Sequence, residues 1–451
     1  MRLRRCWLFL AEACALSIVA CGGSGAESAP TDGGAEAADD TGAADTGPAI
    51  WQHETGPKDV GPPIDHGTPS TTYPAYAPDL PMLQNNGGAV LKTPVVVTIT
   101  WPGERNADAF EKFGDLIGTS SYWKSIASEY GIGPAVSGAP NHVRLTDAAP
   151  AAYADYELEQ LVQDRAGNVA TSKWPAPTEQ TIYLMYVPHG TKVSLFGKDA
   201  CSSGYGGYHY STDIAGQTVA YAVVVQCKFG GGTTLTQSTN TASHELGEAA
   251  TDPQPNVQRG YAGFDSAHFV WELFQQYQTE NGDACEFYDD RAFLGPDDFP
   301  FEVQRQWSNK SAKAGHAPCV PVADGAYFNV VPQDVENVTV NTSSMGGPTH
   351  LKTKGFHIGV GETKTIKVGF YSDQATAPWS ISVAENNPIL GGGSPDHFDV
   401  KIDSASGQNG EYAHLAVTVN SAAPSKYEQL VVVSTDSLGN SHYEPILITS
   451  E

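Results

Sequence analysis

The chain has 451 residues, of which 51 are acidic and 25 are basic, and its formal net charge is −26 at pH 7. This charge excludes a protein that binds the phosphate backbone of nucleic acid, because such binding needs a basic surface. Beyond the N-terminus no apolar run reaches the ~18 residues of a membrane span, which excludes a multi-span membrane protein. The length predicts about three units at roughly 150 residues per domain.

Residues 1–20 are typical of a bacterial lipoprotein signal peptide. Three arginines within the first five residues form a basic start, and an apolar stretch with a small-residue exit follows. The sequence IVAC at 18–21 resembles the lipoprotein box, which predicts that Cys21 is lipidated. An ordinary cleaved signal is the alternative, and the protein would then be secreted.

Residues 21–75 are predicted to form a disordered acidic tether. Gly, Ala, Thr and Pro fill most of this segment, and no basic residue occurs after Cys21 until Lys58. Such a composition cannot bury enough apolar surface to offset the entropy lost on ordering. We therefore expect a protein of the cell envelope or outer surface whose only membrane contact is a lipid anchor.

Residues 80–322 alternate strand and helix patterns, which predicts an α/β domain with a mixed sheet packed against helices. The β-branched run 95–101 ends at Pro102, and Asn106 then precedes an amphipathic helix with Phe110 and Phe113 on one face. Further elements are expected as a helix around 122–130, strands at 181–187 and 219–225, and a helix at about 235–250.

Residues 326–451 lose the helical pattern. Apolar residues alternate with polar or small ones at 366–370 and 415–419, and further strands are expected at 429–434 and 446–448. Turn residues separate these runs. This spacing predicts an all-β, immunoglobulin-like sandwich, for which adhesion, spacing or lid-like support is the expected role.

Four cysteines lie in the region expected to fold after export: Cys201, Cys227, Cys285 and Cys319. An even number in an oxidising compartment favours two disulfides. Three connectivities are possible, and we favour pairing of sequence neighbours, Cys201 with Cys227 and Cys285 with Cys319. A cysteine-ligated metal is the alternative, but no CxxC pair supports it.

The segment 241–253, TASHELGEAATDP, carries the clearest chemical signal. On a helix, His244 and Glu248 are at positions i and i+4, about 40° apart on one face. One imidazole nitrogen and one carboxylate oxygen at this spacing can bind a single Zn²⁺ at ~2.0–2.2 Å. Glu245 would then lie beside the metal, where a general base is needed to take a proton from the attacking water.

A third protein ligand is needed to complete such a site. The segment ENGDAC, 280–285, supplies two acids, and Asp252 at the end of the expected helix supplies another. Our order of preference is Glu280, Asp283 and Asp252. In a gluzincin arrangement one downstream acid binds the metal while a second orients the histidine, and Glu280 and Asp283 could take these roles in either order.

Other interpretations of this helix remain open. The protease signature HExxH is not met, because Glu248 stands where the second histidine belongs. A calcium site, or a helix whose acids and histidine face solvent, is therefore an alternative to zinc. His209 is expected in a Gly/Tyr-rich loop with a structural role, and His268 is expected as a packed core residue.

Several segments, taken together and in order, resemble the bacterial branch of the EXORDIUM-like, phosphate-induced protein family. They are CSSGYGGYH, AYAVVVQC, SHELGEAATDP, ENGDAC, VQRQWSN and APCVP. The resemblance implies an extracellular domain with a zincin-like helix. It permits a peptidase, because His244, Glu245 and Glu248 are all present, although plant members lack the HE pair and are regarded as signalling or wall proteins.

The functional expectation is an exported, lipid-anchored, zinc-dependent metallohydrolase, most simply a peptidase that acts on a peptide or protein substrate. His244, Glu248 and one of the downstream acids would hold the metal, and Glu245 would activate water. One alternative is a non-catalytic surface binding or adhesion protein on an inactive zincin scaffold. Another is a calcium-stabilised wall or matrix component.

Overall fold

The computed structural model describes residues 64–228, 232–275, 279–388 and 397–450. The expected signal peptide, the lipidated Cys21 and most of the acidic tether lie outside these residues. The elements described below belong to a unit that begins at His66. Within the described ranges, no helix is both long enough and apolar enough to cross a membrane.

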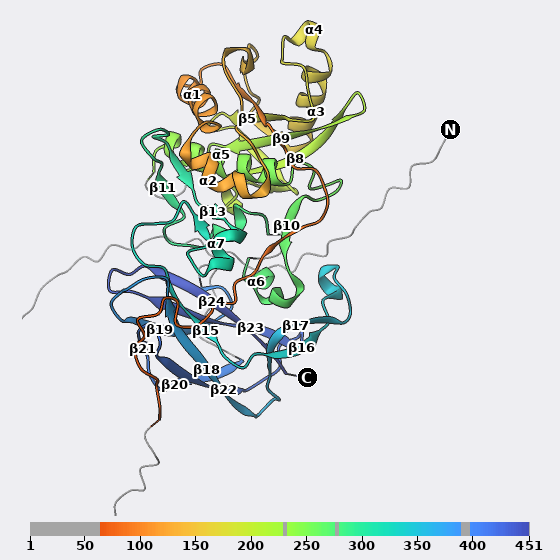
Figure 1. Ribbon diagram of the computed structural model, residues 1–451. Coiled ribbons are helices and arrows are strands. Elements are labelled where there is room, and N and C mark those ends of the chain that lie inside the picture. Colours follow the sequence, from red (N-terminus) through yellow and green to blue (C-terminus); the bar gives the residue numbers. More distant parts are fainter. Residues whose placement is uncertain (1–63, 229–231, 276–278, 389–396, 451) are drawn as a thin grey trace, which may run out of the picture. The chain divides into compact units, whose positions relative to one another are not determined.

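A five-stranded mixed sheet forms the centre of the first folded region (Figure 1). Four strands are parallel, and β8 at one edge runs antiparallel to its neighbour β9. In spatial order the strands are β3 (His142–Arg144), β2 (Val95–Thr100), β5 (Thr181–Val187), β9 (Gln217–Val225) and β8 (Gly207–Ile214).

Both faces of this sheet are buried, as the near-continuous apolar runs predict. In β5, Ile182 and Leu184 belong to one apolar core while Tyr183 and Met185 belong to another on the opposite face. Side chains alternate across a strand, so a strand that is buried on both faces needs helices on both sides.

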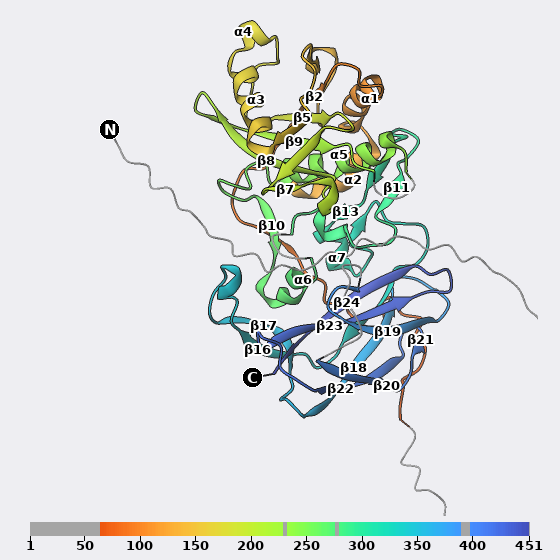
Figure 2. The same cartoon turned by 180° about the vertical axis from the view of Figure 1, so that it is seen from behind.

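Helices cover both faces of the sheet. On one face, α3 (Asp155–Gly167) contributes Leu158 and Val162 to the core. The opposite face is covered by α1 (Ala107–Ile117), α2 (Ser121–Ala127) and α5 (Thr234–Thr251), as Figure 1 and Figure 2 show. The α/β architecture is thereby confirmed at this coarse level.

Helix boundaries depart from expectation in two places. Asn106 precedes α1, but its side chain makes no capping hydrogen bond. The second expected helix is split, because α2 ends at Ala127 and a 3-10 turn continues to Tyr130. The hydroxyl of Ser120 caps the N-terminus of α2 by accepting a hydrogen bond from the N–H of Trp123.

Shorter elements complete this region. They are the strand pair β1 (Leu83–Asn85) and β10 (Tyr261–Phe264), the pair β11 (Ala292–Leu294) and β12 (Glu302–Gln304), the pair β13 (Gln306–Trp307) and β14 (Cys319–Val320), the sheet of β4 (Ala152–Ala154), β6 (Lys192–Leu195) and β7 (Lys198–Asp199), and the helices α4 (Val169–Ser172), α6 (Phe269–Phe274) and α7 (Asn309–Ala314).

Both favoured disulfides are present and confirm the neighbour pairing. Cys201 is joined to Cys227, and Cys285 is joined to Cys319. The second bridge ties the 3-10 helix η5 (Asp283–Cys285) to β14. It therefore holds one of the predicted ligand segments against the rest of the domain.

Among its described residues, the C-terminal region is all-β apart from a single 3-10 turn, and it consists of two sheets around one apolar core. One sheet contains β15 (Phe328–Pro332), β18 (Thr363–Ser372), β22 (Tyr412–Val419) and β20 (Phe398–Ile402). The other contains β16 (Glu336–Val340), β17 (Leu351–His357), β24 (Ser441–Thr449), β23 (Tyr427–Thr435), β19 (Trp379–Glu385) and β21 (Ser406–Gly407). This arrangement confirms a sandwich of two sheets.

The sandwich also contacts two segments from earlier in the chain. Residues that the sequence assigns to the tether pair with it instead, since the Ser70 N–H donates to the carbonyl of Asn409. His268, expected in a core, instead pairs with Asp265 and with Asp79, and Asp79 also binds Lys354 of β17. These ionic contacts join the α/β region to the sandwich.

Candidate metal centre

Helix α5 carries the HELGE motif through the middle of the α/β region. Its first turn is capped by the Thr233 hydroxyl, which accepts the N–H of Thr236, and its last turn ends where the Asp252 N–H donates to the carbonyl of Glu248. The helix lies between the central sheet and β12, so residues on several of its faces are buried. This burial explains why small residues such as Ala242, Gly247 and Ala249 lie in and beside the motif, because the helix packs closely on its neighbours.

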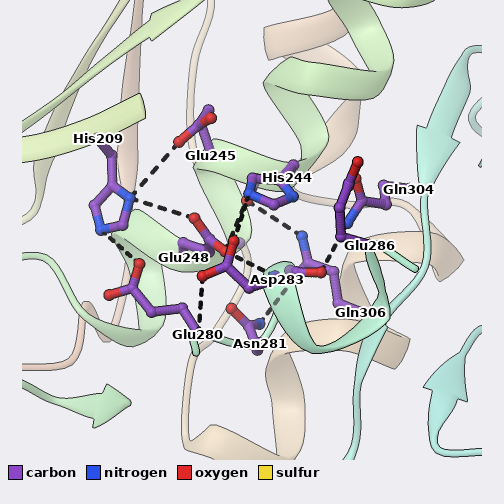
Figure 3. Close-up of polar contacts among 12 residues, drawn as sticks. His209, His244, Glu245, Glu248, Glu280, Asn281, Asp283, Glu286, Gln304 and Gln306 are labelled. Carbon is purple, nitrogen blue, oxygen red and sulfur yellow. Dashed lines mark hydrogen bonds and ion pairs between the residues drawn. The ribbon is translucent and has the colours of Figure 1, made fainter. Parts of the chain in front are cut away.

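Three of the predicted metal ligands meet at one point (Figure 3). Nε2 of His244 lies 3.1 Å from Oε1 of Glu248 and 3.6 Å from Oδ1 of Asp283. The first pair is one turn apart on α5, and Asp283 reaches them from η5. We refer to His244, Glu248 and Asp283 as the outer trio.

The outer trio fits a divalent cation by its donor chemistry and its spacing. Zinc bonds of ~2.0–2.2 Å in a tetrahedral site place neighbouring ligand atoms roughly 3.3–3.6 Å apart, close to the separations in the trio. Gly282 lets the backbone of the downstream segment approach the ligand atoms closely, because a Cβ there would lie 2.8 Å from both Glu248 Oε1 and His244 Nδ1. The backbone at Gly282 therefore passes so close to these ligand atoms that a Cβ there would displace them.

Hydrogen bonds hold the downstream segment against α5. The Asp283 N–H donates to Oε1 of Glu248 over 3.0 Å, and the Gln304 amide donates to the carbonyl of Gly282 over 2.8 Å. The side chain of Gln306 joins this segment to α5, because its Oε1 accepts the side-chain amide N–H of Asn281 over 2.8 Å and its amide donates to the carbonyl of Ser243 over 2.7 Å. The ligand segment is therefore positioned by two glutamines from neighbouring strands as well as by its disulfide.

The remaining predicted acids lie elsewhere. Glu280, our first choice as third ligand, is outside the outer trio, and its Oε2 lies 3.8 Å from Nε2 of His209. Glu245 turns toward the same imidazole, with Oε2 at 3.7 Å from Nδ1 of His209 (Figure 3). The Asp252 carboxylate accepts the N–H of Gly260 and is not part of the trio.

His209 is the residue that sequence reasoning undervalued. It lies on strand β8, not in a loop, and it is 6% exposed. The missed signal is a period of two, since Tyr208 packs into the core on one face and His209 faces α5 on the other. Gly207, the neighbour two positions before, leaves room for Glu245, whose Oε1 would lie 2.7 Å from a Cβ there.

Burial changes the ionisation of the acids. It raises the pKa of Glu280 well above the usual value and also raises the pKa of Glu245. Burial together with the adjacent Glu248 carboxylate raises the pKa of Asp283 to about 7. A bound cation would favour the charged form of these carboxylates and so reverse the shifts.

The two histidines respond to the same negative surroundings. Burial alone would lower both pKa values, but Glu280 beside His209 and Glu248 beside His244 raise each well above its usual value. Burial acts to raise the pKa of Glu248, yet His244 and His209 outweigh it and hold that pKa below its usual value. The centre thus attracts positive charge, as a cation site requires.

Comparisons with known proteins add little to this geometry. No protein-family model and no curated protein matches the sequence. A solution NMR structure of a lipoprotein from Bacteroides thetaiotaomicron is similar at 16% identity and a TM-score of 0.19, over 29% of this chain and 86% of that one. That similarity is too low to support an argument, and the EXORDIUM-like resemblance stays a prediction.

Proposed function

We propose that the protein is a metal-dependent hydrolase, specifically a zinc peptidase with a zincin-like active-site helix. The observation that carries this proposal is the meeting of His244, Glu248 and Asp283 at ligand spacing within a largely buried centre. Asp283 replaces Glu280 as the proposed third ligand. The single imidazole favours zinc, while the two carboxylates leave calcium as the competing metal.

Glu245 is the proposed general base. When bound, zinc would polarise the scissile carbonyl and lower the pKa of a coordinated water. Glu245 follows His244 directly on α5 and is buried, and burial raises the pKa of its carboxyl toward the range where it can accept and return a proton. It would take the proton of the attacking water and deliver it to the leaving amine.

The outer edge of β8, with which no other strand pairs among the described residues, supports a peptide as substrate. The Val225 N–H donates to the carbonyl of Gly206, and the alternation of an antiparallel ladder then turns the N–H and C=O groups of Gly207, His209 and Ser211 outward. The side chain of Asn256 bonds both outward groups of Ser211. The stretch Gly207–His209 remains beside the centre, where an extended peptide could pair with it as a further strand.

The proposed setting is the cell envelope, with the protein anchored through a lipid on Cys21. The acidic segment after this cysteine would separate the folded regions from the membrane. Mass spectrometry of the detergent-extracted protein tests the anchor, because a diacylglyceryl-modified N-terminal cysteine is expected. An unmodified chain cleaved elsewhere would indicate a secreted protein.

The substitution Glu245→Gln tests the catalytic role. It should lower kcat on a cleaved peptide by about 100- to 10,000-fold, because the base is lost, while the zinc held by His244, Glu248 and Asp283 is retained. Glu179→Gln, in an exposed loop, is the matched control and should leave kcat unchanged.

The first measurement is the cleavage of a peptide library by the zinc-loaded wild type, followed by kinetics on a selected peptide. Retained zinc with no turnover of any peptide would contradict the peptidase proposal and favour a non-catalytic surface binding protein. Full activity in the Glu245→Gln variant would contradict the role of this residue alone.

A further inference from the structure

The two oxygens of Glu248 face two different histidines. Oε1 lies 3.1 Å from Nε2 of His244, and Oε2 lies 3.5 Å from Nδ1 of His209. Figure 3 shows the two imidazoles on opposite sides of this carboxylate. A carboxylate in this position can bind one cation with each oxygen, as in two-metal sites.

The hydrogen bonding of His209 leaves its other nitrogen available as a ligand. The Nε2–H donates to the carbonyl of Asp252 over 3.1 Å, so in the neutral imidazole that binds a metal the lone pair lies on Nδ1. Nδ1 faces Oε2 of Glu248 at 3.5 Å and Oε2 of Glu245 at 3.7 Å. These separations exceed an ordinary hydrogen bond and approach the roughly 3.3–3.6 Å between neighbouring ligands of one zinc ion.

Burial and charge support a cation at this second position. The side chains of His209, Glu245 and Glu248 are only 3–4% exposed. On the far side of the imidazole, Glu280 is turned toward His209 with a side chain 9% exposed, and its Oε1 has no hydrogen-bond partner among the residues that the structure describes. Buried carboxylates around one imidazole are costly without a compensating positive charge.

We infer that the centre has a second divalent-cation site, formed by Nδ1 of His209 and one oxygen each of Glu245 and Glu248. We call His209, Glu245 and Glu248 the inner trio. Glu248 bridges the inner and outer trios, and Glu280 lies behind His209 as a support for the imidazole. The ligand class is a borderline metal ion such as zinc, because nitrogen and carboxylate oxygen share the site.

Filling the inner trio would inhibit the hydrolase, a consequence that rests on the proposed function. Glu245 cannot accept a proton while it binds a cation. Peptide cleavage should therefore rise as the first equivalent of zinc is added to the apoprotein and fall as the inner trio fills. Limiting zinc would give the active, singly loaded protein.

Calorimetric titration of the full-length apoprotein with zinc chloride tests the site. The wild type should bind two equivalents, and both His209→Ala and His244→Ala should bind one. His350→Ala, at an exposed position in the C-terminal region, is the matched control and should still bind two. One equivalent in the wild type, unchanged by His209→Ala, would overturn the second site and leave the proposed function standing.

Absence of any binding to the wild type would overturn both proposals, so the two failures are distinguishable. A zinc anomalous difference map of wild-type crystals provides a readout that does not depend on how the variants fold. Two peaks that share Glu248 support the inference. A single peak beside His244 at saturating zinc contradicts it.

Discussion

At the scale of single residues, the site depends on spacings that the sequence reveals only in part. The i, i+4 pair His244 and Glu248 follows directly from helical geometry, so the sequence alone was sufficient to propose it. Glu280 and Asp283 are both acidic and three residues apart, and no periodicity indicates which of them faces α5. His209 reaches the centre through strand pairing, which a local pattern cannot show.

Gly282 gives a residue-scale prediction. Its φ of −73° suits alanine, so the effect of Gly282→Ala should come from the new methyl group, which would lie 2.8 Å from Glu248 Oε1 and His244 Nδ1. We expect zinc affinity to fall by about 10- to 100-fold, as when an outer contact of a metal ligand is lost.

Calorimetry on the refolded apoprotein measures this change. Gly167→Ala is the control, because the nearest atom to a Cβ there is a methyl of Ile214 at 3.8 Å. Equal zinc affinity in Gly282→Ala and the wild type would show that the outer trio does not need this close approach.

At the scale of elements, the long strands and helices follow the sequence patterns well. The run 181–187 is a strand buried on both faces, and the expected helix at 235–250 lies within α5. The short pairs β11–β12 and β13–β14 could not be predicted, because strands of two or three residues show no period. These pairs nevertheless carry the glutamines that position the ligand segment.

The disulfide beside η5 gives an element-scale prediction. Replacing Cys285 and Cys319 by serine removes a bridge that spans 34 residues, which should lower the unfolding free energy by about 3–4 kcal/mol in the chain-entropy model. It should also weaken zinc binding at the outer trio, because the bridge anchors the segment that carries Asp283.

Replacement of Cys201 and Cys227 by serine is the matched control. That bridge spans 26 residues and should give a similar loss of stability, about 3–4 kcal/mol, while the outer trio keeps its zinc affinity. Urea unfolding and zinc titration of both double variants measure the two effects. An equal loss of zinc affinity in both would contradict a specific role for the bridge at η5.

At the scale of the whole molecule, the sequence predicted an α/β region and an all-β region but not the contacts between them. Val338 and Leu447 of the sandwich belong to the same apolar cluster as α5, and the side-chain amide of Asn387 donates to the carbonyl of Phe274. Contacts between residues so far apart in sequence leave no periodic signal. The ionic group of Asp79, His268 and Lys354 is a further link of this kind.

This ionic group predicts a pH dependence of stability. The hydrogen bond from His268, with help from Lys354, lowers the pKa of Asp79 from 3.8 to about 2 despite burial. The stabilisation that the charged Asp79 carboxylate contributes is therefore present above pH 3.8 and is lost as the pH falls through about 2. Burial disfavours charge on His268, but Asp265 and Asp79 outweigh burial and raise the pKa of His268 above 6.5. The stabilisation contributed by the charged His268 is therefore present below pH 6.5 and is lost as the pH rises through the raised pKa.

We expect Asp79→Asn to destabilise the protein most between about pH 4 and pH 6, by roughly 0.5–1 kcal/mol, because the carboxylate is half-exposed and screened. Urea unfolding at acidic, intermediate and alkaline pH measures the difference. Asp297→Asn, at an exposed position, is the control and should change little. A difference that stays constant across the pH range would contradict the ionic link.

The most direct test of the central claim is the position of zinc in the protein. Crystals grown with one equivalent of zinc and measured at the zinc absorption edge should show an anomalous peak about 2.0–2.2 Å from His244 Nε2, Glu248 Oε1 and Asp283 Oδ1. Crystals that contain zinc only at unrelated surface residues, with these three side chains still in place and no peak between them, would contradict the account.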